Sequence, residues 1–388
     1  MVRINNPFIV RGLIPNEYFC DRDVEIARLT RELTNHNDIV LKSPRRIGKT
    51  ELIYHCMAQP ELADNYYIFF VDILQTSSLK EFTYALGQAV FETLKPISKK
   101  MSDLFINTVR SIQMDYTYDP ITGLPKFGFS LGAIENPSYT LDEIFRCIEL
   151  ADRRCIIAID EFQRIAKYPE KNVEAILRTH IQKMSNCNFI FAGSERHMLD
   201  LIFNDSSRPF YGSTSSMALA PLSKDKYLPF VCKLFNEFNK KISQADAEHI
   251  YDLFGGNTFC MQKTFNMAFS ITEKKEKCSL ETLQYAIDEI LIESETDFRT
   301  KLASMPLRPK ELLIAIAKEG HAKQLTSASF IHKHHLSSAS SVQSTTRQLL
   351  EDAWITYDIT TNDEKIFSLT DAFMALWLKD KFGIGFRL

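Results

Sequence analysis

Residues 39–57 hold the feature that most constrains the fold: an apolar run, a short polar loop and a helix-like segment follow one another directly. The apolar run 39–41 predicts a buried parallel strand. The loop 43–50 has the sequence Ser-Pro-Arg-Arg-Ile-Gly-Lys-Thr and ends in the Gly-Lys-Thr triplet of a phosphate-binding P-loop (Walker A). Backbone N–H groups of such a loop and the positive end of the following helix converge on phosphates. Strand, loop and helix are the context that this motif needs, so a chance triplet at a helix start is the weaker interpretation.

The P-loop assigns chemistry to individual residues. We expect Lys49 to contact the β- and γ-phosphates and the Thr50 hydroxyl to bind Mg²⁺. The full set expected at the nucleotide, ATP or ADP, is Ser43, Pro44, Arg45, Arg46, Ile47, Gly48, Lys49, Thr50 and Glu51. Ser43 departs from the pattern, because a glycine that eases a tight turn usually takes the first position. The loop must therefore reach its geometry by another route.

A second motif follows the apolar run 155–159, which ends in Asp160 and Glu161. A buried strand with two carboxylates at its carboxyl end is typical of a Walker B site. We expect Asp160 to hold Mg²⁺ through a water molecule and Glu161 to polarise the attacking water. The alternative is that the two carboxylates belong to a helix N-terminus, which favours acidic residues. The presence of a P-loop in the same chain makes this alternative the weaker one.

Two further expected strands also end in polar residues. The run 67–71 ends in Asp72, and the run 189–192 is followed by Gly193 and Ser194. Ligands of doubly wound sheets lie at the carboxyl ends of the strands. We therefore expect Ser194 to contact the γ-phosphate or the attacking water, which completes a catalytic set with Lys49 and Glu161. These features favour the P-loop class with a catalytic glutamate, in which the sensor strand separates the P-loop strand from the Walker B strand.

The composition bounds what the whole chain can be. With 388 residues it predicts two or three domains, and its 45% of hydrophobic residues suffices for full cores. A net charge of −3 gives no global bias toward nucleic acid or an anionic membrane. No apolar run approaches the roughly 20 residues of a membrane span, and the N-terminus shows no signal-peptide core. Eight cysteines without a C-x-x-C pair favour free buried thiols, so we expect a cytoplasmic protein.

Three regions follow from the pattern of expected elements. Residues 1–221 form the P-loop domain, in which Asp21 is expected to cap the first helix and a β-hairpin is inserted at 115–131. Residues 222–305 carry four expected helices and predict a lid. Residues 306–388 hold three expected helices and a hairpin, the pattern of a winged helix-turn-helix. The aromatic residues of the inserted hairpin either contact a partner or pack on their own domain.

Several segments together resemble a known family. Residues 19–25 resemble its F-x-G-R-x-x-E box and 44–50 its P-R-R-x-G-K-T loop. Residues 160–163 and 192–194 resemble its Walker B and sensor segments. The chain is therefore similar to the archaeal-type ATPase family of P-loop proteins, which stands near the AAA+ initiators and the STAND switch NTPases.

This resemblance implies an α/β fold, namely a P-loop NTPase three-layer sandwich with a parallel sheet, followed by a helical lid and a winged helix-turn-helix domain. In this family the box helix and the segment before it flank the adenine, so the resemblance makes Arg22, Tyr18 and Phe19 candidates for that position. Residues 255–258 resemble the G-x-P signature of the family's lid, but Thr258 stands where a proline is expected.

Three functions fit these features. The first is an ATP-dependent switch that hydrolyses ATP slowly until an unknown protein partner, or the chain itself, supplies an arginine. Arg208 is one candidate for this arginine, although a plain loop arginine is the simpler interpretation of it. The second is an ATP-regulated protein that grips double-stranded DNA through its winged helix. The third is a protein that holds ATP only structurally, for which Ser43 is the sole support.

Charge gives the DNA hypothesis little support. Residues 307–388 hold ten basic and nine acidic residues, and Arg347 is the sole cation of the expected recognition helix at 338–350. Non-specific DNA binding depends on phosphate neutralisation. Some neutral side chains of that helix could still hydrogen-bond to phosphates or base edges, namely Ser340, Ser341, Gln343, Ser344 and Thr345. DNA contact and protein contact therefore stay equally open for this domain.

Overall fold

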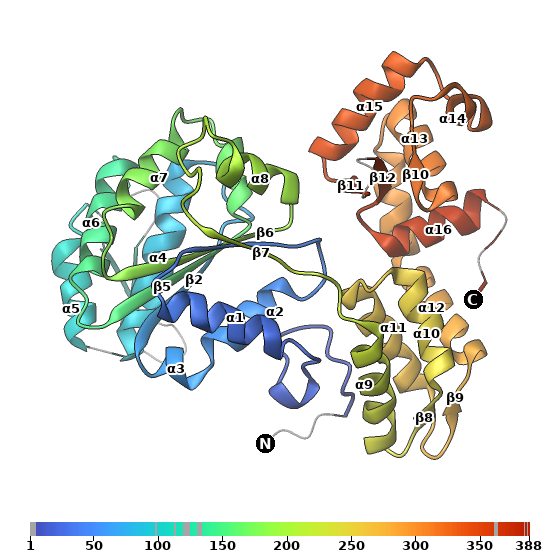
Figure 1. Cartoon of the computed structure of the whole chain (residues 1–388), viewed down its shortest axis with the longest axis horizontal. Helices are drawn as coiled ribbons and strands as arrows, with labels where there is room; N and C mark the ends of the chain where they lie inside the picture. Colours follow the sequence, from blue (N-terminus) through green and yellow to red (C-terminus); the bar gives the residue numbers. More distant parts are fainter. Residues whose placement is uncertain are drawn as a thin grey trace. The chain divides into compact units, whose positions relative to one another are not determined.

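The structure is a computed structural model that describes residues 5–97, 99–111, 114–118, 125–129, 134–360, 364–383, 385 and 387–388. It divides into two compact units (Figure 1). One unit is Asp21–Ala220, and the other joins Pro221–Leu388 to the segment that ends at Cys20. None of the helices in the described part of the chain has the length and apolar character that a bilayer crossing requires.

The unit Asp21–Ala220 is built on a five-stranded sheet in the order β2-β5-β6-β1-β7, with parallel neighbours throughout (Figure 1). The strands are β1 (Ile39–Lys42), β2 (Tyr66–Asp72), β5 (Arg154–Asp160), β6 (Cys187–Gly193) and β7 (Ser215–Ala218). The sensor strand β6 thus lies between the P-loop strand β1 and the Walker B strand β5. This is the order that the sequence predicts, and it brings the carboxyl ends of all three strands to one edge.

Helices cover both faces of this sheet, and alternate strand residues enter two separate cores. Ile157 and Phe189 pack into one core and Ile156 and Ile190 into the other. The helices of the first core are α4 (Leu79–Ile97), α5 (Lys99–Thr108), α6 (Pro137–Glu149), α7 (Val173–Ile181) and α8 (Arg196–Asn204). Those of the second core are α1 (Asp23–Thr34), α2 (Lys49–Met57) and α3 (Pro60–Ala63). Because β5 and β6 are buried on both faces, their central residues 155–159 and 189–192 are continuous apolar runs, and the expected three-layer sandwich is confirmed.

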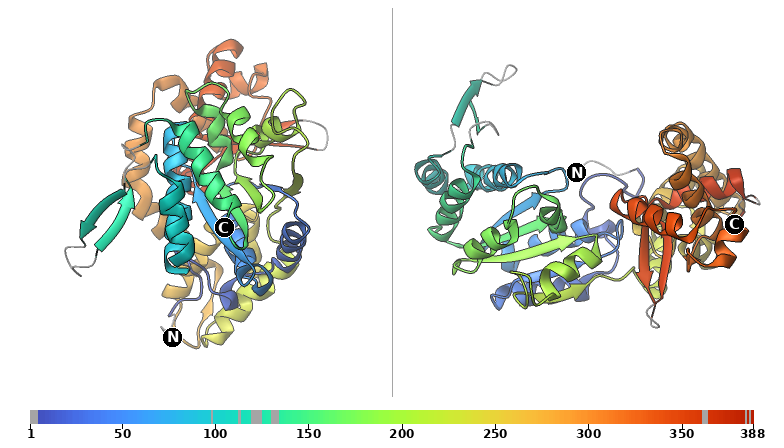
Figure 2. Two further views of the ribbon diagram at one scale, coloured as in Figure 1. Left: turned by 90° about the vertical axis from the view of Figure 1, so that its left-hand side faces the viewer. Right: turned by 90° about the horizontal axis from the view of Figure 1, so that it is seen from above.

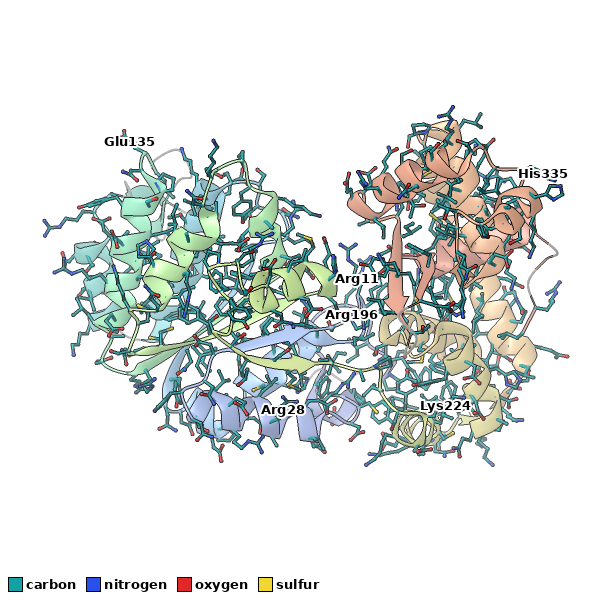
Figure 3. The ribbon with its side chains drawn as sticks, turned by 45° about the horizontal axis from the view of Figure 1, so that its top comes forward. Arg11, Arg28, Glu135, Arg196, Lys224 and His335 are labelled. Atoms are coloured by element: carbon teal, nitrogen blue, oxygen red, sulfur yellow. The ribbon has the colours of Figure 1, made fainter. Side chains whose placement is uncertain are left out.

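The first helix of this unit departs from the sequence prediction at its start. Asp21 is not its N-cap, because α1 begins at Asp23 and Arg22 occupies the cap position without a capping side-chain bond. Farther along α1, Arg28 (labelled in Figure 3) donates from Nη2 to the carbonyl of Ser216, 3.0 Å away. This bond ties α1 to the edge strand β7.

The inserted hairpin is present as two antiparallel strands, β3 (Met114–Tyr118) and β4 (Pro125–Phe129). Figure 2 shows them away from the five-stranded sheet. The side chains of 112–133 and the backbone of 112–113, 119–124 and 130–133 lie outside the described residues. The two interpretations of the hairpin's aromatic residues therefore stay predictions.

The second unit contains the four helices expected for a lid: α9 (Lys224–Glu237), α10 (Gln244–Phe254), α11 (Thr258–Ile271) and α12 (Leu280–Ala303). A parallel pair of short strands, β8 (Lys241–Ile242) and β9 (Lys277–Cys278), was not expected. The N-terminal segment packs on these helices, since the fully buried ring of Phe8 contacts the rings of Phe235, Phe265 and Phe269. The three domain limits drawn from the sequence stay predictions.

The same unit ends in the expected winged helix. It comprises α13 (Leu307–Glu319), β10 (Ala322–Lys323), α14 (Ala328–Lys333), α15 (Ala339–Glu351), β11 (Ile355–Ile359), β12 (Lys365–Leu369) and α16 (Ala372–Phe382). Strands β11 and β12 form the antiparallel hairpin, and β10 extends it to the order β10-β12-β11. The helix α16 was not predicted. Its Phe373 and Trp377 contact Phe254 and Phe298 of the lid helices, so both parts share one core.

Candidate nucleotide-binding site

The P-loop of the structure reaches its turn without a glycine at its first position. Ser43 is fully buried, and its N–H donates to the carbonyl of Gly193, 3.2 Å away. The left-handed backbone conformations fall later in the loop, at Arg46 (φ 65°) and Gly48 (φ 86°). Left-handed backbone favours glycine, and Ser43 is not in that conformation, so its φ angle allows a side chain. Gly48 is the N-cap of α2, which places the positive end of this helix directly behind the loop.

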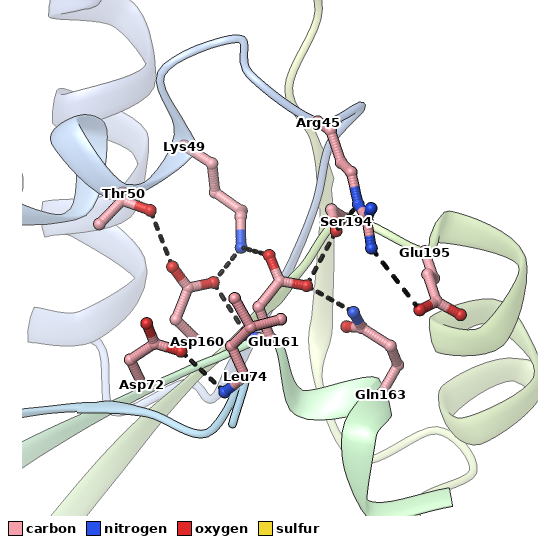
Figure 4. Close-up of polar contacts among 10 residues, drawn as sticks. All are labelled: Arg45, Lys49, Thr50, Asp72, Leu74, Asp160, Glu161, Gln163, Ser194 and Glu195. Carbon is pink, nitrogen blue, oxygen red and sulfur yellow. Dashed lines mark hydrogen bonds and ion pairs between the residues drawn. The ribbon is translucent and has the colours of Figure 1, made fainter. Parts of the chain in front are cut away.

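Four side chains of the two Walker motifs meet at the carboxyl edge of the sheet (Figure 4). Lys49 Nζ pairs with Asp160 Oδ1 and lies 3.3 Å from Glu161 Oε1. The Thr50 hydroxyl donates to Asp160 Oδ2 at 2.8 Å. The Lys49 side chain is only 7% exposed. A buried charge is costly unless it is paired, and here each member of the cluster supplies a partner for another.

Glu161 is held by neighbours from three segments of the chain. Ser194 Oγ donates to its Oε2 at 2.8 Å, and Gln163 Nε2 donates to the same oxygen at 2.5 Å. Burial opposes ionisation of this carboxyl, but the charge of Lys49 and the hydrogen bonds from Gln163 and Ser194 lower its pKa overall. Glu161 therefore stays ionised at neutral pH. Gln163 lies in the segment 160–163 that resembles the family's Walker B motif, but no role was predicted for it from the sequence.

The sensor segment is connected to the P-loop. Arg45 Nε donates to Ser194 Oγ at 3.3 Å, and its Nη2 lies 4.0 Å from Glu195 Oε1 (Figure 4). Lys167 pairs with the same Glu195 oxygen at 3.2 Å. Ser194 also donates to Glu161, so a chain of two hydrogen bonds connects the P-loop cation Arg45 to the expected general base.

The remaining P-loop residues differ in exposure. Ile47 is buried in the core below the loop, Pro44 and Glu51 are half-buried, and Arg46 is exposed. Their expected contacts with the nucleotide stay predictions.

Arg22 braces the P-loop from behind. Its buried guanidinium donates from Nη2 to the carbonyls of Ala220, at 2.9 Å, and Ile47, at 3.4 Å. Its Nη1 pairs with Glu25 at 2.6 Å. Phe19 follows the 3-10 helix η1 (Asn16–Tyr18) and is half-buried in the other unit. The place of both residues at the adenine stays a prediction.

Two other expectations concern single polar residues. Asp72 ends β2 in register with Asp160, and burial together with the charges of Asp160 and Glu161 raises its pKa. Arg208 pairs with Glu174 at 2.5 Å, as a loop arginine does.

In the lid signature, Asn257 caps α11 and Thr258 is its first residue, a position that proline favours.

Thr50 and Asp160 also suit Mg²⁺. The cation prefers hard oxygen ligands and usually binds through one or two carboxylates and the phosphates of its substrate. The hydroxyl of Thr50 and the carboxylate of Asp160 already share one place. The donor set therefore fits this ion, and the site offers a cation for phosphates, oxygens for a metal and an ionised carboxylate for a water molecule.

Comparison with known proteins identifies these parts. The family model "ATPase domain predominantly from Archaea" matches residues 19–263, and the model "Probable winged helix domain" matches residues 296–380. No curated protein matches the chain.

Solved structures share the whole architecture at low sequence identity. The Walker-type ATPase Paby2304 of Pyrococcus abyssi is 18% identical with a TM-score of 0.64, over 96% of this chain and 99% of that chain. The ORC2 protein of Aeropyrum pernix, in ADPNP–ADP complexes, is 13% identical with a TM-score of 0.58, over 97% and 98%. The ORC1 protein of Aeropyrum pernix, in complex with DNA, is 13% identical with a TM-score of 0.53, over 97% and 96%. These likenesses are of fold.

Proposed function

Because the chain belongs to the family of ATPase domains found predominantly in Archaea, we propose that it is a nucleotide-dependent switch that hydrolyses ATP with Mg²⁺. The observation that carries this proposal is the convergence of Lys49, Thr50, Asp160 and Glu161 from two strand ends. A protein that only held ATP would not need the ionised Glu161 and its donors.

Each side chain has a role that follows from its contacts. Lys49 supplies the cation for the phosphates, and it exchanges its bond to Asp160 for that contact. Glu161 accepts a proton from water, which its lowered pKa allows at neutral pH. Ser194 and Arg45 hold the second oxygen of Glu161 and the sensor segment in place. Mg²⁺, when bound at Thr50 and Asp160, neutralises charge on the phosphates.

The pairing of Lys49 with Asp160 supports the switch, because the same lysine is the one expected to contact the phosphates. When nucleotide binds, Lys49 leaves Asp160 for the phosphates. The balance of charge at the carboxyl edge of the sheet therefore depends on whether nucleotide is bound. Phosphoryl transfer is commonly accelerated by an arginine supplied from a partner. Arg208 is engaged with Glu174, so we infer that an unknown protein partner completes the site and that turnover is slow without it.

Steady-state hydrolysis of Mg-ATP tests the proposal, with wild type beside Glu161→Gln. We expect slow turnover in the wild type and a loss of about 100-fold or more in the variant, because the base is removed without changing the size of the side chain. Glu61→Gln, at an exposed position of α3, is the matched control and should retain turnover. Equal turnover in wild type and Glu161→Gln would reject the assigned role of Glu161.

The alternative function, ATP-regulated binding of double-stranded DNA, is favoured by one surface of the winged helix. Helix α15 exposes Ser340, Gln343, Ser344 and Arg347. Thr345, which was expected on this surface, is instead buried at 7% exposure and packs inward with Val342 and Leu349. With one cation on the helix, the electrostatic grip is weak.

A duplex-DNA titration at about 50 and about 200 mM salt distinguishes the two functions. If the DNA function holds, Arg347→Ala should weaken binding and reduce the salt slope by about 1. Absence of binding at the lower salt concentration would leave the winged helix as a protein-contact module.

A further inference from the structure

Gln163 is a fully buried glutamine whose amide nitrogen is hydrogen-bonded and whose amide oxygen, within the described part of the chain, is not. It lies on the 3-10 helix η3 (Phe162–Lys167), which starts directly after Glu161. Its Nε2 donates to Glu161 Oε2 at 2.5 Å, as Figure 4 shows. Its Oε1 is buried without a hydrogen-bond partner among the described residues. Buried polar atoms are nearly always paired, and each exception calls for an explanation.

The space for this amide comes from Gly193, at the end of the sensor strand β6. A Cβ at that position would lie 1.9 Å from Gln163 Oε1 and 3.1 Å from Leu199 Cδ1. The backbone of Gly193 is not in the left-handed region, so its φ angle does not call for glycine. The close approach of Gln163 does.

The backbone of Glu161 contributes to the same arrangement. Glu161 has φ 59°, a left-handed conformation that is uncommon for a residue with a side chain. This turn ends β5 and starts η3 within one residue, which folds Gln163 back beside the Glu161 carboxylate. Strained backbone of this kind often occurs at functional sites.

A structural role alone would not select glutamine here. An apolar side chain of similar length, such as methionine, would fill the space without leaving a carbonyl oxygen unpaired. We propose that Gln163 is a positioning residue for ATP hydrolysis: together with Ser194 it fixes one oxygen of Glu161, and Gly193 is glycine in order to admit its amide. The inference rests on the proposed function, in which Glu161 accepts the proton of the attacking water.

The two carboxylate oxygens of Glu161 thereby take different roles. Oε2 receives both neutral donors, Gln163 and Ser194. Oε1 faces Lys49 alone, at 3.3 Å, among the described contacts. When Lys49 turns to the phosphates, Oε1 is the oxygen left to accept a proton from water. Gln163 thus sets which oxygen is available and in which direction it points.

The first experiment compares wild type, Gln163→Met and Gln182→Met in the full chain. Gln182 is an exposed glutamine at the end of α7 and serves as the matched control. We expect Gln163→Met to lower kcat by about 10- to 100-fold, as a small misplacement of a reacting group does. ATP affinity should change by less than about 3-fold, because no phosphate contact is lost. The acid limb of the kcat–pH profile should move to higher pH, since Glu161 loses a donor that favours its ionised form.

A second set of variants tests the space at Gly193. Gly193→Ala should also lower kcat, because its Cβ displaces the amide. In the double variant Gly193→Ala with Gln163→Ala the collision is absent, so kcat should equal that of Gln163→Ala alone. Such non-additivity is expected only of residues that act through one contact. If Gly193→Ala does not fold, Gln163→Met alone decides the question.

The outcomes separate this inference from the function on which it rests. Full kcat and an unshifted pH profile in Gln163→Met, beside an inactive Glu161→Gln, would overturn the positioning role and leave ATP hydrolysis standing. A loss of ATP affinity as large as the loss of kcat would also overturn it, because Gln163 would then support only the fold of the site. Absence of Glu161-dependent turnover in the wild type would overturn the proposed function and the inference together.

Discussion

Asp38 and Glu161 stand at opposite ends of the same parallel sheet, and both are carboxylates largely removed from water. Asp38 precedes β1, and the backbone N–H of Phe189 donates to its Oδ1 at 2.9 Å. Burial raises its pKa to about 6, which that bond, the more distant charge of Arg178 and a side-chain hydrogen bond from Asn188 do not offset. At the other end, Lys49 and two side-chain donors lower the pKa of Glu161 despite burial.

The difference shows that burial alone does not mark a functional carboxylate. Desolvation disfavours the ionised form at both ends of the sheet, and the partners decide the net direction of the shift. A lysine in direct contact and donors aimed at one oxygen prepare Glu161 for proton transfer. Asp38 has no such cation in direct contact among the described residues. We therefore infer that its role is structural, namely to accept the hydrogen bond from Phe189 that connects the start of β1 to β6.

The largest effect is expected from Lys49→Ala. This change would leave Glu161, like Asp38 at the other end of the sheet, without a lysine in direct contact. ATP affinity should fall by about 100-fold or more, because the main phosphate cation is gone. Asp160 and Glu161 would become a pair of like charges that keep neutral donors but lose their cation, which raises the pKa of Glu161 and destabilises the unit by about 3 kcal/mol. Calorimetry with ATP and urea unfolding at pH 7 measure the two effects.

The exposed Lys183 offers a control for this change, as Lys183→Ala removes a cation of the same unit away from the site. It should leave both measurements at the wild-type values. Unchanged ATP affinity in Lys49→Ala would reject the P-loop assignment itself.

A smaller effect of opposite sign is expected from Asp38→Asn. The pKa of Asp38 in the folded state, about 6, lies above the ordinary value of 3.8. The folded state thus binds the proton more tightly, and this stabilisation is complete below pH 3.8 and lost as the pH rises through about 6. The amide keeps an acceptor for Phe189 but carries no charge. We expect Asp38→Asn to be more stable than wild type at pH 8 by about 1 to 2 kcal/mol.

Urea midpoints of both proteins at pH 4.5 and pH 8, taken as about 1.5 units below and 2 units above the raised pKa, check this. The difference between variant and wild type should be small at the lower pH and grow at the higher one. A difference that does not depend on pH would mean that Asp38 is ionised in both states and that its pKa is not raised.

The smallest effect is expected from Ser194→Ala, which removes one of the two neutral donors of Glu161 and the acceptor of Arg45. Since Lys49 and Gln163 remain, the pKa of Glu161 should rise less than in Lys49→Ala. We expect kcat to fall by about 10-fold with nearly unchanged ATP affinity. The acid limb of the pH–rate profile measures the shift, and Ser206→Ala, at an exposed serine, is the control. A loss as large as that of Glu161→Gln would show that Ser194 touches the reacting groups directly.

The parts of the fold that were predictable are those with a local signature. The P-loop, the runs before Asp160 and Ser194, and the hairpin of the winged helix each follow from a short stretch of chain. The helix α16 has no such signature, because Phe373, Trp377 and other apolar residues lie around its whole circumference. A helix that is apolar all round is recognised only once its surroundings are known.

Taken by itself, the sequence determined which polar side chains reach the edge of the sheet: Lys49 and Thr50 after β1, and Asp160 and Glu161 at the end of β5. These are consequences of local spacing, since a strand followed by a polar turn has the same meaning wherever it lies. Only the tertiary structure decided that Gln163 lies against Gly193, that Arg22 binds the carbonyl of Ile47, and that Asp38 is half-buried without a cation in direct contact among the described residues. Such contacts depend on which strands are neighbours and on the space between their side chains, and neither is encoded in a short stretch of chain.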